Sequence, residues 1–130
     1  MNYTGVIIEE SLRDSSLLKD FKITGTEIEI VNENFKTPWL TQWTLHTIEI
    51  EEDDIDRVAD QISRSFDRDH SDWYADFKND VSHYIIFPNK VFKVDCGNVE
   101  NYRPAVKHGF DLGIPIYQLN FKPEIEKWQF

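Results

Sequence analysis

The chain has 130 residues, of which 40% are hydrophobic and 14% aromatic. Disordered chains are poor in aromatic side chains and this length suits one core, so we expect a single folded domain over residues 1–130. The formal net charge is −10. Nucleic acids and anionic membranes attract proteins through a basic face, so the charge argues against both as partners.

The cysteine content and the apolar runs indicate where the protein works. Cys96 is the single cysteine, so no intrachain disulfide can form, which is typical of a reducing compartment. No apolar run approaches the roughly 20 residues that span a bilayer. The first residues, MNYTGVIIEESLRD, lack the basic start and the apolar centre of a signal peptide. We therefore expect a cytoplasmic protein.

Three strands are predicted in the first part of the chain. The first covers about residues 4–11, where β-branched residues follow one another. The second covers 26–31 after a turn at Gly25, because isoleucines alternate with glutamates there. The third covers 42–50 and contains His46. We interpret His46 as a core-edge histidine bonded to a neighbour, because a lone histidine lacks the partners of a metal or catalytic site.

A helix is predicted over residues 51–66, where apolar residues recur at the spacing of one buried stripe. Asp53 is placed to cap the first turn, and Asp56 stands at the capping-box position. The acidic cluster at the start of this helix consists of Glu51, Glu52, Asp53, Asp54 and Asp56. Negative charge at a helix N-terminus is stabilising, which accounts for most of the cluster. The alternative is that the cluster forms a surface for a basic partner protein.

The loop 67–72, with the sequence DRDHSD, is similar to a metal-binding loop in composition only. Its aspartates and Ser71 offer oxygen ligands and His70 a nitrogen ligand, but an EF-hand needs glycine at the sixth position and glutamate at the twelfth. Those positions hold Asp72 and Lys78. The chain also has no phosphate-binding glycine loop and no paired-cysteine motif. We therefore predict no metal and no cofactor.

The stretch that follows is predicted to contain three short strands joined by tight turns, at 73–79, 82–87 and 91–94. A second helix is predicted over 99–112, with Asn98 as its cap. The order of elements is then β-β-β-α-β-β-β-α. Strands in runs with helices between the runs indicate an α+β fold with a largely antiparallel sheet of about five to six strands. We expect both helices to pack on one face of that sheet.

Three strings within about Trp43–Leu119 carry a resemblance. They are WYADFKND, HYIIFPNKVFKVD and LGIPIYQL. Together they resemble a family of small conserved bacterial and archaeal proteins without an assigned activity. The resemblance implies a compact stand-alone domain, and it carries over no catalytic residue.

The strand at 73–79 holds the polar residues that come closest to a functional group. Tyr74, Asp76 and Lys78 share one face of it, His83 lies just across the turn, and His46 is expected on a neighbouring strand. Such a group could do general acid–base work if it lined a cleft. On a solvated face, the same residues would form cross-strand pairs that need no function.

Two functions remain open. We expect a protein-binding or regulatory module that recognises a basic protein through acidic side chains and aromatic anchors. The alternative is a small acid–base enzyme that uses the His/Asp/Lys/Tyr group, although we assign no catalytic residue. A third hypothesis is a homodimer that forms through an edge strand or through the tail 116–130.

Overall fold

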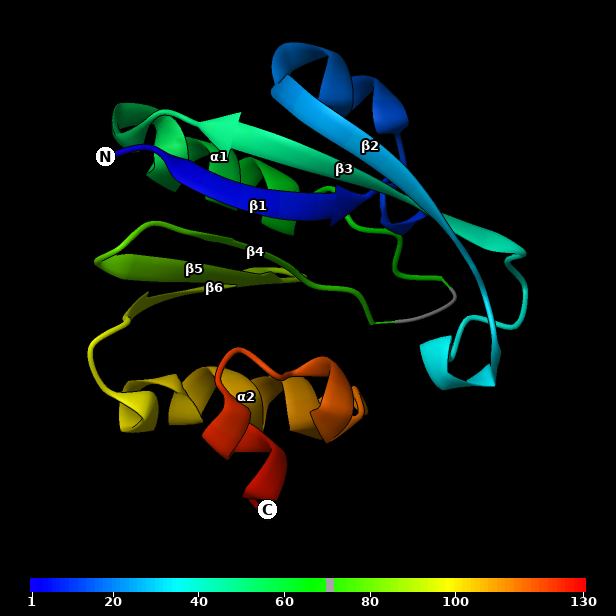
Figure 1. Ribbon diagram of the computed structural model, residues 1–130. Coiled ribbons are helices and arrows are strands. Elements are labelled where there is room, and N and C mark those ends of the chain that lie inside the picture. The colour runs from blue at the N-terminus through cyan, green and yellow to red at the C-terminus, as the bar shows by residue number, and fades with distance from the viewer. Residues whose placement is uncertain (70–71) are drawn as a thin grey trace.

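The computed structural model describes residues 1–69 and 72–130. Its centre is a six-stranded antiparallel sheet with the strand order β2-β3-β1-β4-β5-β6 (Figure 1). The strands are β1 (Tyr3–Ile8), β2 (Lys22–Ile30), β3 (Gln42–Ile50), β4 (Ala75–Lys78), β5 (Ser82–Phe87) and β6 (Lys90–Asp95), and the helices are α1 (Ile55–Ser63) and α2 (Arg103–Asp111). The structure confirms the predicted α+β class, the antiparallel sheet and the order of elements.

The strand β1 lies in the middle of the sheet although it comes first in the chain. It pairs with β3 on one side and with β4 on the other, both antiparallel. At its centre Gly5 lies opposite Ile48 of β3 and Phe77 of β4. β1 therefore joins a sheet half made of β2 and β3 to a half made of β4, β5 and β6.

The two helices lie on opposite faces of the sheet and not on one face, as the sequence led us to expect (Figure 1). Alternate residues of β5 show the difference: Tyr84 and Ile86 belong to the core around α1, whereas Ile85 and Phe87 belong to the core around α2. Successive side chains of a strand point to opposite faces. The unbroken apolar run of β5 is therefore explained by burial on both of its faces.

The first helix is shorter than predicted. The acidic residues Glu52–Asp54 form a 3-10 turn, the regular helix covers Ile55–Ser63, and no side-chain cap bond forms at its start. The predicted capping role of Asp53 was therefore wrong. Phe66 lies beyond the helix in an isolated bridge with Leu12, where it is fully buried.

The predicted turn at Gly25 is a β-bulge within one long strand. β2 runs from Lys22 to Ile30 and pairs with β3 along its length, with a register shift between Ile23 and Gly25. Glycine tolerates such irregular backbone, so the same residue can signal either a bulge or a turn.

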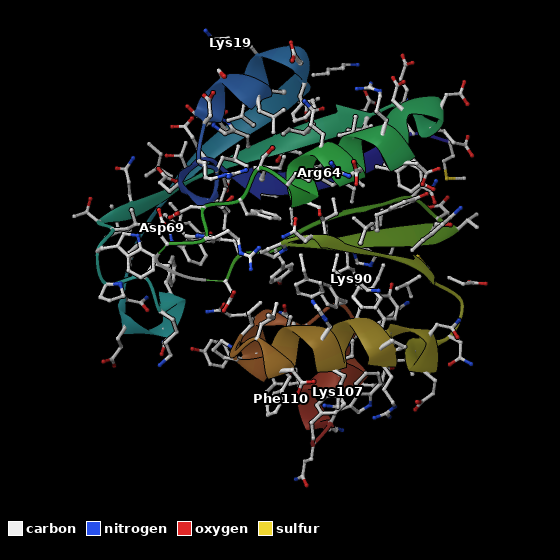
Figure 2. The ribbon with its side chains drawn as sticks, turned by 180° about the vertical axis from the view of Figure 1, so that it is seen from behind. Lys19, Arg64, Asp69, Lys90, Lys107 and Phe110 are labelled. Atoms are coloured by element: carbon white, nitrogen blue, oxygen red, sulfur yellow. The ribbon has the colours of Figure 1, made fainter. Side chains whose placement is uncertain are left out.

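The tail 116–130 packs against the rest of the chain. Two 3-10 turns return it to α2, and Leu119 and Ile125 are fully buried in the core on that face. Figure 2 shows Lys107 and Phe110 on the side of α2 that is turned away from the sheet, and the Phe110 ring lies 5.6 Å from the ring of Phe130. In the part of the chain that the structure describes, no helix combines the length and the apolar content needed to cross a membrane.

Candidate binding cleft

One face of the sheet is covered over only half of its width. α2 and the tail pack on the β4, β5 and β6 half, whereas Val6 of β1 and Glu29 of β2 are exposed on the other half. A cleft of about 740 Å³ opens between this bare half and the residues that follow α2. The lining comes from β1, β2, β3, the loop 34–37, the segment 72–76 and the segment 112–118.

Hydrogen bonds between distant segments hold the two walls of the cleft together. The hydroxyl of Tyr117 donates to the backbone oxygen of Asn34 at 2.8 Å, and the side-chain amide of Gln118 donates to the same oxygen at 3.0 Å. The Asn32 side chain closes the 32–35 turn by accepting from the Asn34 amide at 2.8 Å. The loop from β2 to β3 is therefore tied to the turn after α2.

A row of aromatic side chains lines the wall nearest β3. The ring centres of Phe35 and Trp43 are 4.4 Å apart, and those of Trp43 and Trp73 are 5.5 Å apart. Trp43 is fixed because its Nε1 donates to Thr37 Oγ1 at 3.0 Å. Trp73 is only 5% exposed, and its Nε1 has no hydrogen-bond partner in the described chain. The row gives the cleft rigid π faces, on which cations bind favourably.

The charged side chains of the lining are mainly acidic. Glu29, Asp72 and Asp76 are carboxylates, and Lys36 is the single cation among the described residues of the lining. An acidic lining next to aromatic faces favours a positively charged ligand through both Coulomb attraction and cation–π contact.

Asp76 is the most firmly positioned of these carboxylates. Its Oδ2 lies 2.6 Å from Nε2 of His83, which donates to it, and Nδ1 of His83 lies 2.9 Å from the hydroxyl of Tyr102. His83 is 2% exposed, so it stands behind the carboxylate and not in the cleft. Because both of its ring nitrogens are bonded, this histidine can hold Asp76 in a single orientation.

Tyr74 lines the cleft with its ring, while its hydroxyl donates to the backbone oxygen of Gln118. Burial raises the pKa of the Tyr74 hydroxyl well above its usual range, and the nearby charge of Asp76 raises this pKa further. The hydroxyl therefore stays protonated and is occupied by a structural bond.

The structure brings together part of the predicted face. Tyr74, Asp76 and His83 lie on the cleft side of the sheet, and Asp76 and His83 are bonded to each other, whereas Lys78 is exposed and does not line the cleft. Thr47 of β3 and Asp76 of β4 both lie opposite Val6 of β1, so these three residues share the cleft face. His46 is next to Thr47 in its strand and therefore lies on the opposite face. The expected place of His46 in this group was therefore wrong.

His46 has partners of its own on the α1 face. Its Nε2 lies 2.9 Å from Glu9 Oε1, and its Nδ1 lies 2.9 Å from Thr26 Oγ1. The predicted bonding of this histidine to neighbouring side chains is confirmed.

The acidic cluster at the start of α1 is separate from the cleft, and none of its five members is a lining residue. Three of them have partners: the amino group of Met1 lies 2.5 Å from Glu52, Arg57 lies 3.5 Å from Asp54, and the Tyr84 hydroxyl donates to Asp56 at 2.6 Å. The remaining members, Glu51 and Asp53, are exposed.

Metal binding at the loop 67–72 depends on two residues outside the described part, His70 and Ser71. Within residues 1–69 and 72–130, no group of three or more His, Cys, Asp or Glu side chains is placed to hold a metal ion.

Most of the cleft was missed in the sequence. Glu29, Phe35, Trp43, Trp73 and Tyr117 come from separate segments, and only the folded sheet places them together. The available signal was limited to Trp43 and Trp73, which lie at the start of β3 and just before β4.

Comparisons with known proteins give no relative for this arrangement: no family model, no curated protein and no solved structure matches the chain. The resemblance to small bacterial and archaeal proteins therefore remains an expectation.

Proposed function

We propose that the protein is a binding module, and that its cleft takes an arginine or lysine side chain of a basic partner protein. The observation that carries the proposal is the lining itself, in which three carboxylates and one lysine accompany a row of closely packed aromatic rings. A guanidinium or ammonium group gains from both features, and arginine stacks better on flat rings than lysine does.

The dimensions of the cleft fit this ligand. Ligand sites in proteins have volumes of about 300–1,000 Å³, and the cleft has about 740 Å³. It is therefore larger than one side chain needs, which leaves room for the backbone on either side of an inserted arginine. The net charge of −10 would also speed the approach of a basic protein at low salt.

An arginine-rich peptide provides the first test. We expect a hexa-arginine peptide to change the fluorescence of Trp43 and Trp73, to bind more weakly as salt rises, and to bind more tightly than a hexa-lysine peptide. Asp76→Asn and Trp43→Ala should each weaken binding by about tenfold or more, because buried charge pairs and aromatic anchors dominate such contacts.

Glu27→Gln supplies the matched control. Glu27 lies two residues before Glu29 on the same strand and the same face, but it does not line the cleft. If Glu27→Gln or Glu51→Gln reduces affinity as much as Asp76→Asn does, the peptide binds to the overall negative charge and the proposed cleft site is wrong.

Acid–base catalysis is the second candidate function, and the 2.6 Å contact between Asp76 and His83 is the observation that favours it. We place it second because only Asp76 of this pair reaches the cleft, while His83 is bonded at both nitrogens. A general base must come within hydrogen-bond reach of the proton it removes. The carboxylate meets that requirement, and the histidine serves to position it.

A further inference from the structure

Within the described residues, β2 forms an edge of the sheet with no strand on its outer side. All nine of its residues, Lys22–Ile30, are exposed, and the sheet order places β3 on its inner side only. Such an edge presents a row of free backbone donors and acceptors, which can template pairing with another strand. Natural proteins shorten or cover such edges, or place charges and bulges on them. β2 has charges and a bulge, but it is nine residues long and uncovered.

The exposed apolar side chains of β2 gather on one face. Ile23, Ile28 and Ile30 are 41%, 59% and 75% exposed. In the pairing with β3 they lie opposite Ile48, Thr44 and Gln42, which all share the α1 face. The bulge between Ile23 and Gly25 is what places Ile23 on the same face as Ile28. The edge therefore carries an apolar stripe as well as open backbone groups.

We propose that β2 pairs antiparallel with β2 of a second copy of this chain, with the twofold axis at Thr26. Thr24 is the extra residue of the bulge. In this register, Ile23 of each copy therefore lies opposite Ile28 of the other. Lys22 of each copy then lies opposite Glu29 of the other. Paired residues share a face of the joined sheet, so both matches are sterically consistent.

The self-complementary register is the reason for choosing a second copy as the partner. It places four isoleucines together on one face. On the other face it brings each Glu29 next to Lys22 of the other copy, which already lies 2.6 Å from Glu49 of its own chain and would then bridge two carboxylates. Glu27 lies opposite Gly25 and has no charged partner in this register. An interface of one strand from each copy is smaller than a standard stable interface, so the dimer forms reversibly at high protein concentration.

Sedimentation equilibrium over a range of protein concentrations tests the proposal. Wild-type protein should dimerise, and Glu29→Lys should weaken the association by about tenfold or more, because two attractive pairs become two repulsive pairs. Glu27→Lys, with the same charge change on the same face, should not weaken it. The double variant Lys22→Glu/Glu29→Lys should restore it in part, because a carboxylate at position 22 also faces Glu49 of its own chain.

A crosslink tests the register. In a Cys96→Ser background, Thr26→Cys should form a disulfide between two copies under mild oxidation, because residues opposite each other on antiparallel strands approach within about 4.5–5.5 Å. Circular dichroism confirms that each variant is folded.

Two results would overturn the proposal. One is a wild-type chain that stays monomeric at all concentrations, which leaves the edge to a strand of another protein. The other is a dimer on which Glu29→Lys and Glu27→Lys act alike and in which Thr26→Cys does not crosslink. These measurements contain no peptide, so their failure leaves the proposed cleft untouched.

Discussion

Gly5 is the glycine at which an added side chain would find the least room. A Cβ atom at this position would lie 1.9 Å from the backbone oxygen of Asp76 and 2.6 Å from Phe77 Cδ1. The backbone of β4 would have to move to make room, and β4 carries Asp76 into the cleft. Because Gly5 has no side chain, β4 can lie close enough to β1 to place the Asp76 carboxylate in the cleft.

Gly5→Ala should lower the free energy of unfolding by about 3 kcal/mol or more, because overpacking against backbone costs at least the usual amount for a core position. Gly25→Ala is the matched control, since a Cβ at Gly25 would meet no atom within 4 Å. Its effect should stay within about 0.5 kcal/mol. Denaturant unfolding followed by tryptophan fluorescence measures both, and equal losses would contradict the structure.

At the scale of elements, α2 is attached to the sheet partly through His108. Its ring lies 4.9 Å from the ring of Phe87 and 5.5 Å from the ring of Phe92. Burial lowers the pKa of His108 below its ordinary value of 6.5, and the charge of Lys90, labelled in Figure 2, lowers this pKa further. The folded state therefore favours the neutral imidazole at this contact.

The sign of the resulting pH dependence follows from proton binding. As pH falls below about 6.5, the unfolded chain takes up a proton at His108 before the folded chain does, so this histidine reduces stability. Lowering the pH from 7.5 to 5.5 should therefore reduce the unfolding free energy of the wild type more than that of His108→Gln. A difference that stays constant over that range would contradict the assignment.

The elements themselves could be predicted from local patterns, but their arrangement could not. Alternation identified β2, and the apolar stripe identified α1, because those signals lie within a few neighbouring residues. The face that each helix covers depends on pairings between strands far apart in the chain, as the reversed position of His46 shows. Trp43 and Trp73 meet for the same reason, so the cleft had no local signature.

At the scale of the whole molecule, the net charge of −10 opposes compaction by self-repulsion. At low protein concentration, raising NaCl from 10 to 300 mM should therefore increase the free energy of unfolding, by about 1 kcal/mol. The double variant Glu51→Lys/Asp53→Lys, whose net charge is −6, should respond less. A salt response of equal size in both proteins would show that repulsion within the acidic cluster is not its source.

The central place of β1 also has a consequence for how the chain is made. β1 leaves the ribosome before either of its partners, β3 and β4, and the second of these follows at residues Ala75–Lys78. Until then, one hydrogen-bonding edge of β1 has no native partner in the nascent chain. The sheet halves can be joined only after most of the protein has been synthesised, so the acid-lined cleft, which spans both halves, is among the last features to form.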